Sequence, residues 1–171
     1  SSLFQLQDES GLISVNTLTR DRLSSLFTLV NINQSLVPSA FGKLNDYIDN
    51  DSDYQPNGAE IKEYKAAGIP GPANRYLRSP HELSSVLGWT SMMSEDQFHA
   101  IVPFLTAAPV VPININTAPK ETLMVMGLTH QEAEKLITFR EDIAVTFTNI
   151  NDLFPTTSKG IDTDIFLYFP S

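Results

Sequence analysis

The sequence of 171 residues contains no cysteine. It therefore has no disulfide bond, no thiolate ligand for a metal and no cysteine nucleophile. Basic residues are also scarce, because 11 Lys and Arg stand against 20 Asp and Glu and the formal net charge is -9. Non-specific affinity for nucleic acids comes mainly from Lys and Arg that displace counterions. This charge balance argues against a nucleic-acid partner.

Long hydrophobic runs are absent as well. No stretch of about 18 apolar residues occurs, and no segment has the pattern of a signal peptide. Hydrophobic residues nevertheless make up 42% of the chain, which is enough for a core. The sequence has no initiator Met and both of its ends look cut. We therefore expect a fragment of a longer protein that folds as one domain, or as one domain with an inserted lobe.

Helix signals fill the middle of the chain. Capping-box patterns begin at Ser79, Ser94 and Thr129, each with Glu or Gln three positions later. In such a box the first and fourth side chains hydrogen-bond to each other's backbone N–H groups and start a helix. Apolar periodicity predicts two further helices, at 19–30 and 38–48.

Strand signals lie at the two ends. Apolar and polar residues alternate at 2–8, and a run of apolar residues occupies most of 164–169. Residues 49–76 are rich in Asp, Asn, Gly and Pro, which predicts ordered loops.

The chain also repeats itself. The pattern of residues 13–23 recurs at 113–123, where Ile, an apolar residue, Asn and Thr return at the same spacing. A second echo pairs "SPHEL" at 79–83 with "NINDL" at 149–153. Two related helical units are therefore predicted, with chance similarity as the alternative.

Residues 112–136 resemble half of a helix-hairpin-helix module. Such a module holds a phosphate on the backbone N–H groups of a glycine-rich turn at a helix N-terminus. Here Thr129 replaces the second glycine, and its Cβ would crowd the phosphate. Residues 120–142 carry three basic and five acidic side chains. The sequence therefore predicts a packing unit in which Thr129 and Glu132 cap a helix, with a nucleic-acid-binding module as the alternative.

Oxygen-bearing side chains alternate along residues 49–60. With Asp49 as position 1, they occupy positions 1, 3, 5, 7, 9 and 12. This is the spacing by which an EF-hand loop surrounds calcium. Tyr54 stands where an EF-hand needs glycine, and Pro56 stands where it has an aliphatic residue. The hypothesis is therefore a calcium loop unrelated to the EF-hand, and the alternative is a solvated acidic turn.

No catalytic site is predicted. The three histidines, His81, His99 and His130, are scattered along the chain, and no nucleophile–base pair or phosphate-binding loop occurs. We expect Trp89, directly after Gly88, to pack in the core. The sequence therefore does not predict an enzyme.

Four segments, in this order, resemble the minor pseudopilin K family of the bacterial type II secretion system. They are "DESGLISVNTL" at 8–18, "DYIDNDSDYQPNGAEIKEY" at 46–64, "GPANRYLRSPHELSSVLG" at 71–88 and "ININTAPKETL" at 113–123. The resemblance implies an α+β fold, in which a pilin-like α/β scaffold carries a large inserted helical domain with helix-hairpin-helix or SAM-like units. Residues 1–16 and 161–171 would form the sheet portion, and 17–160 the insert with its calcium loop at 46–64.

The resemblance also implies metal ligands in the acidic loop. The residues on the family's acidic positions, with Asp53 as a further candidate, are Asp46, Asp49, Asp51, Asp53 and Glu60. The family usually has a second acidic residue after Gly-Ala-Glu, but this chain has Ile61. A second calcium ion is therefore not expected unless Glu63 supplies the carboxylate.

The role implied by the resemblance is structural. A protein of this family caps the tip of the pseudopilus and helps to initiate its assembly, in a complex with minor pseudopilins I and J and without nucleic acid. It lies on the periplasmic side of the inner membrane of a Gram-negative bacterium. Its membrane anchor is an N-terminal hydrophobic helix, which the given sequence lacks.

Overall fold

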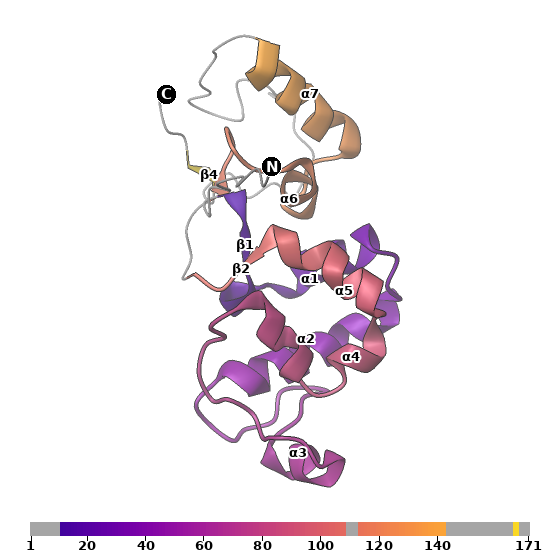
Figure 1. The fold of residues 1–171 in the computed structure, drawn as a ribbon, viewed down its shortest axis with the longest axis vertical. Helices are drawn as coiled ribbons and strands as arrows, with labels where there is room; N and C mark the ends of the chain where they lie inside the picture. Colours follow the sequence, from indigo (N-terminus) through magenta and orange to yellow (C-terminus); the bar gives the residue numbers. More distant parts are fainter. Residues whose placement is uncertain (1–10, 109–112, 143–165, 168–171) are drawn as a thin grey trace, which may run out of the picture. The chain divides into compact units, whose positions relative to one another are not determined.

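The computed structural model describes residues 11–108, 113–142 and 166–167, which belong to two compact units (Figure 1). One unit is Ser14–Val110, and the other combines Ser1–Ile13 with Val111–Ser171. The predicted domain limits at 16 and 161 stay a prediction, because residues 143–165 lie outside the described part of the chain. No helix among the described residues is long and apolar enough to cross a membrane.

The larger unit is mainly helical. Its helices and strands are β1 (Ile13–Ser14, at the junction of the units), η2 (Val15–Thr17), α1 (Arg20–Leu29), η3 (Gln34–Leu36), α2 (Val37–Ile48), α3 (Ile61–Ala67), η4 (Pro80–Ser85), α4 (Trp89–Met92), α5 (Glu95–Ile101), η5 (Val102–Phe104) and β2 (Leu105–Thr106). Strands β1 and β2 form a two-stranded sheet, and α3 lies at the far end of this unit from them (Figure 1).

Local signals start these helices as predicted. Thr19 caps α1 by accepting a hydrogen bond from the backbone N–H of Arg22, and Ser94 with Gln97 forms a reciprocal capping box at α5. The predicted helices at 19–30 and 38–48 correspond to α1 and α2. The prediction of a box at Ser79 is only partly correct, because Ser79 accepts from the N–H of His81 but starts the 3-10 helix η4.

Trp89 packs at the centre of the larger unit, as predicted. Its side chain is almost fully buried, and its ring meets that of Phe27 edge to face at 6.3 Å between centroids. The indole Nε1–H donates to the carbonyl of Ala40 in α2 at 3.2 Å, so the one polar atom of the ring is satisfied.

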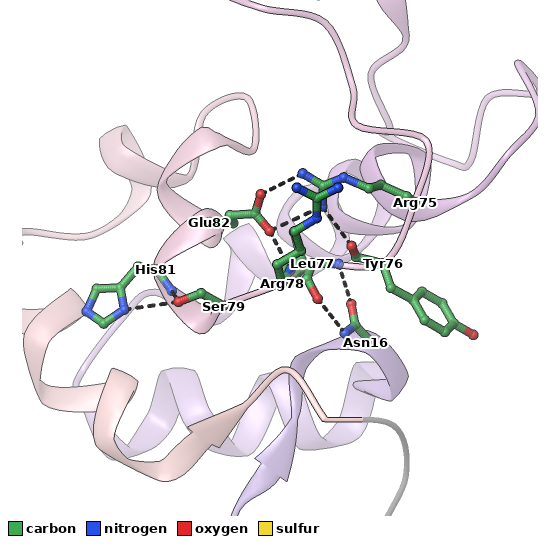
Figure 2. Close-up of polar contacts among 8 residues, drawn as sticks. All are labelled: Asn16, Arg75, Tyr76, Leu77, Arg78, Ser79, His81 and Glu82. Atoms are coloured by element: carbon green, nitrogen blue, oxygen red, sulfur yellow. Dashed lines mark hydrogen bonds and ion pairs between the residues drawn. The ribbon is translucent and has the colours of Figure 1, made fainter.

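Asn16 fastens a distant segment to the start of this unit (Figure 2). Its Nδ2 donates to the carbonyls of Leu77 (3.0 Å) and Ala107 (2.9 Å), and its Oδ1 accepts from the N–H of Leu77 (2.8 Å). Asn16 is buried, so these bonds are shielded from water. One side chain thereby holds the segment before η4 and the segment after β2 together.

Glu82 organises the segment next to this contact. Its carboxylate accepts hydrogen bonds from the guanidinium of Arg75, at 2.8 and 3.3 Å, and from the backbone N–H of Arg78 (Figure 2). These bonds lower the pKa of Glu82 to about 2. In a regular capping box the Glu82 carboxylate would accept from the backbone N–H of Ser79. Here it accepts from the backbone N–H of Arg78 instead.

The smaller unit contains β3 (Ile113–Asn114), α6 (Lys120–Val125), α7 (His130–Asp142) and β4 (Phe166–Leu167). Strand β4 lies within the strand predicted at 164–169 and pairs parallel to β3, with Ile113 opposite Phe166. The strand predicted at 2–8 lies outside the described residues. The core of this unit consists of Ile113, Ile115, Ala118, Leu123, Met126, Leu128, Ala133 and Leu136.

The two units share the repeat seen in the sequence. Strands β1 and β3 begin at Ile13 and Ile113, and helices α1 and α6 begin at Arg20 and Lys120. Each pair is separated by the same 100 positions as the sequence echo. The repeated pattern therefore produces the same strand–turn–helix order twice.

Candidate metal site in the acidic loop

The acidic loop folds around Asp46, a fully buried residue near the C-terminal end of α2. Its Oδ1 accepts a hydrogen bond from the backbone N–H of Gln55 at 3.0 Å, and the backbone N–H of Ala59 hydrogen-bonds to the same carboxylate. Asp46 thus holds the segment of the loop that returns to α2. The alternating pattern of 49–60 did not include this residue, which only the family resemblance had indicated.

Two glycines allow the loop to approach α2 this closely. A Cβ on Gly58 would lie 2.0 Å from Oδ2 of Asp46, and a Cβ on Gly42 would lie 2.4 Å from the carbonyl oxygen of Pro56. Both distances are shorter than any non-bonded contact. Only residues without side chains fit at these two positions.

Three carboxylate oxygens in this region are buried without a hydrogen-bond partner. They are Oδ2 of Asp46, Oδ1 of Asp49 and Oε1 of Glu60. The side chains of Asp46 and Glu60 are 0% and 3% exposed. Unpaired buried carboxylate oxygens are costly, because burial removes water and nothing replaces it. A proton or a cation at these oxygens would remove this cost.

The pKa values of these three carboxyls are all raised above their ordinary values. Burial is the largest cause that raises the pKa of Asp46, Asp49 and Glu60, and repulsion from neighbouring carboxylates raises all three further. Asp51 contributes to this repulsion at each of them. Raised pKa values mean that ionising these carboxyls is less favourable in the folded loop than in the unfolded chain.

The other two predicted ligands, Asp51 and Asp53, are exposed. Oδ1 of Asp51 accepts a hydrogen bond from the backbone N–H of Asp53 at 2.9 Å, so these residues form a local turn. Three of the five predicted ligands therefore carry a buried oxygen without a partner, and the other two lie at the loop surface.

Glu63 caps α3, and its place as a ligand of a second calcium ion stays a prediction. Its Oε2 accepts hydrogen bonds from the hydroxyl of Tyr54 (2.9 Å) and from the backbone N–H of Glu60 (3.0 Å), which caps α3. These bonds lower the pKa of Glu63, with the Tyr54 hydroxyl as the largest cause. Tyr54, which breaks the EF-hand pattern, thus ties the loop to α3. The spacing of Glu60 and Glu63 is a cap signal that the sequence analysis missed.

Tyr64 connects α3 to the segment that contains η4. Its buried hydroxyl accepts a hydrogen bond from the backbone N–H of Leu87 at 2.9 Å, and its ring lies 6.0 Å from that of Tyr47. Burial raises the pKa of Tyr64 to about 12, so the phenol stays neutral. The acidic loop is therefore anchored on both sides, by α2 and by α3.

The acidic side chains of the loop are not arranged as a coordination shell. Among the described residues, no group of three acidic or histidine side chains is arranged to hold a metal ion. The charge of Asp46 nevertheless raises the pKa of Asp49 and of Glu60, and the charge of Asp49 raises that of Glu60. Negatively charged carboxylates repel one another and move apart. A cation between them would neutralise this repulsion.

The hairpin of the smaller unit shows no comparable site for a phosphate. The backbone N–H of Thr129 donates to Oε2 of Glu132 at 2.7 Å, and the N–H of Glu132 donates to Oγ1 of Thr129 at 3.3 Å. The prediction that these two residues cap α7 is confirmed. A carboxylate already occupies the N–H group that a phosphate would need.

Comparisons with known proteins identify a family and a similar fold for this chain. Residues 3–110 match the family model of type II secretion system (T2SS), protein K. The fold is similar to a chain in the crystal structure of the GspK-GspI-GspJ complex from the type 2 secretion system of enterotoxigenic Escherichia coli, with a TM-score of 0.67 and 19% identity. The match covers 93% of this chain and 60% of that one, so this chain spans less than two thirds of its structural relative. A search of curated proteins finds no match.

Proposed function

Because the chain belongs to the type II secretion system protein K family, we propose that it is a minor pseudopilin that caps the pseudopilus tip and helps to initiate its assembly. The observation that carries this proposal is the family match over residues 3–110, which contains the whole described part of the larger unit. The similar fold in the GspK-GspI-GspJ complex supports it. The role is structural rather than catalytic.

We propose minor pseudopilins I and J as partners. The relative of similar fold is part of a complex with GspI and GspJ. A subunit at the end of a filament must block further stacking, and for this a rigid lobe is needed. The capped helices and the buried Asn16 contacts supply rigidity to the larger unit. Membership of the secretion-system family supports the further proposal that the protein acts on the periplasmic side of the inner membrane.

We propose calcium as the cation of the acidic loop. Asp46, Asp49 and Glu60 offer the unpaired oxygens, and the exposed Asp51 and Asp53 lie within the same loop. Calcium prefers six to eight oxygen ligands in flexible geometry, which suits carboxylates on a loop. When bound, the ion would supply positive charge to a cluster whose members now repel one another. Its role would be to order the loop.

Reconstitution of the complex tests the proposed function. The chain is mixed with the soluble domains of pseudopilins I and J from the same genome, with calcium present, and the mixture is analysed by size-exclusion chromatography with light scattering. A stable heterotrimer is expected. Pairwise mixtures show which partner binds, and each protein alone is the control for self-association. Three separate peaks from folded proteins would refute the tip role.

A further inference from the structure

The acidic loop contains a dipeptide with a chemistry of its own. Asn57 is the only asparagine in the sequence that glycine follows. It is exposed and adopts a left-handed conformation with φ 63°, which asparagine tolerates better than most residues. The next residue, Gly58, must lack a side chain because Asp46 fills the adjacent space. The backbone at 57 and the carboxylate of Asp46 thus favour an Asn-Gly pair independently of each other.

An Asn-Gly pair is open to spontaneous deamidation. The backbone nitrogen of the glycine loses its proton to hydroxide and attacks Cγ of the asparagine. A new N–Cγ bond forms, the Cγ–Nδ2 bond breaks and ammonia leaves. Water then opens the cyclic imide at either carbonyl, which gives aspartate or isoaspartate without any oxidation or reduction. Glycine permits this reaction best because no side chain hinders the attacking nitrogen.

The folded loop holds this nitrogen back. The backbone N–H of Gly58 donates to the carbonyl of Gln55 at 2.8 Å and closes the turn at 55–58. The next N–H along the chain, that of Ala59, hydrogen-bonds to the buried Asp46, as does that of Gln55. A nitrogen engaged in this way does not deprotonate and attack readily. The turn must open first.

We propose that Asn57 is a deamidation site whose rate is set by opening of the turn at 55–58. The product carries a further negative charge in a loop whose buried carboxyls already repel one another. Isoaspartate also adds a backbone carbon between Gln55 and Ala59 and so alters the turn that presents their two N–H groups to Asp46. Modification of Asn57 thereby loosens the loop in which it occurs.

The chain provides matched internal controls. Asn31 and Asn74 also have positive φ values, of 56° and 49°. They are followed by Ile and Arg, whose side chains hinder attack by the backbone nitrogen. The three residues share a backbone conformation and differ in the residue that follows.

The test follows deamidation by peptide mass spectrometry and an isoaspartate assay during incubation in mildly alkaline buffer. Chelator is present throughout, so the result does not depend on whether a cation binds. The folded protein is compared with the protein in urea and with a series of urea concentrations below the unfolding transition. Asp46→Asn, checked for folding by circular dichroism, loosens the turn by changing its anchor.

Asn57 should react faster in urea than in the folded protein by at least about tenfold, which corresponds to a local opening free energy of roughly 1.4 kcal/mol. Its rate should rise with urea below the transition and in a folded Asp46→Asn variant. Asn31 and Asn74 should stay intact in urea over the same time. Equal Asn57 rates in the folded and unfolded protein would overturn the proposal, and so would equal rates at the three asparagines in urea.

Discussion

The side-chain amide of Asn16 hydrogen-bonds to both the N–H and the carbonyl of Leu77, 61 residues further along the chain. A side-chain amide and a backbone peptide group present the same donor and acceptor, so Asn16 pairs with Leu77 as a neighbouring strand would. Its second donor bond reaches Ala107. The N–H and carbonyl of Leu77, in the segment before η4, are therefore paired as in a sheet, although no strand lies beside them (Figure 2).

Replacing Asn16 should therefore destabilise the larger unit strongly. Asn16→Ala leaves the N–H of Leu77 and the carbonyls of Leu77 and Ala107 without partners, and each buried orphan costs about 1–3 kcal/mol. We expect a loss of roughly 3 kcal/mol or more in the free energy of unfolding, measured by urea denaturation. Asn33→Ala removes an exposed cap of η3 and should cost about 1 kcal/mol. Similar losses for the two variants would contradict this account.

Gly42→Ala should destabilise the protein although it lies inside helix α2. In an open helix, Ala in place of Gly stabilises by about 1 kcal/mol. Here the new methyl group would lie 2.4 Å from the carbonyl oxygen of Pro56, which belongs to the backbone and cannot rotate away. We expect a net loss of about 1–3 kcal/mol in thermal or urea unfolding. Ser39→Ala in the same helix is the control, and a gain in stability for Gly42→Ala would show that the loop moves freely.

Local signals and tertiary contacts contributed differently to what could be predicted. The starts of α1, α5 and α7 were predictable because an N-cap and its partner lie within four residues of each other. The 3-10 form of η4 was not predictable from the sequence. It depends on the bond between Glu82 and Arg75, which lies outside the helix and outside any capping pattern. The need for glycine at 42 is also a tertiary effect.

The same distinction applies to the candidate site. The alternation of oxygen-bearing residues identified the loop, and the family resemblance added Asp46. Neither could show which oxygens are buried without partners, because burial of Asp46 and Glu60 depends on how the loop returns to α2. The cap of α3 by Glu63 follows from its spacing with Glu60, whereas its hydrogen bond from the Tyr54 hydroxyl depends on the folded loop.

Glu82 should titrate far below the ordinary range. The guanidinium of Arg75 is the largest cause of its pKa of about 2, followed by the backbone N–H of Arg78. Arg75→Lys cannot keep both hydrogen bonds to the carboxylate and should raise this pKa, as measured by NMR titration of the carboxyl carbon. Arg78→Lys keeps its charge and its backbone N–H, so its effect should be smaller. Equal shifts would assign the effect to charge alone.

In chelator, the protein should become more stable as the pH falls from 7 to about 5. Folding raises the pKa of Asp46, Asp49 and Glu60 above the unfolded values of 3.8 and 4.5. Their stabilising contribution is complete below the unfolded pKa and is lost as the pH rises through the folded pKa. Glu82, with its lowered pKa, acts only below its ordinary pKa of 4.5. Urea unfolding at several pH values measures the trend.

Asp46→Asn provides the control for this trend. It removes one buried negative charge and the repulsion that this charge exerts on Asp49 and Glu60. The dependence of stability on pH between 7 and about 5 should therefore become weaker in the variant. A wild-type protein that loses stability on acidification over this range would show that the three carboxyls are not the controlling groups.

The effect of a substitution at Asp51 should depend on calcium. This exposed side chain makes only a local hydrogen bond to the N–H of Asp53, yet its charge raises the pKa of Asp46, Asp49 and Glu60. In chelator, Asp51→Ala should leave the melting temperature nearly unchanged, because the lost turn bond is offset by reduced repulsion. In calcium the same variant should melt below the wild type, since an ion at free concentration c that binds only the folded state stabilises it by RT ln(1 + c/Kd), and losing a ligand raises Kd. Differential scanning calorimetry at several calcium concentrations measures both effects.

Ser52→Ala, at the exposed position next to Asp51, should melt at the same temperature as the wild type in both buffers. Equal losses for Asp51→Ala in calcium and in chelator would remove this residue from the metal site, and a wild-type melting temperature indifferent to calcium would remove the site itself.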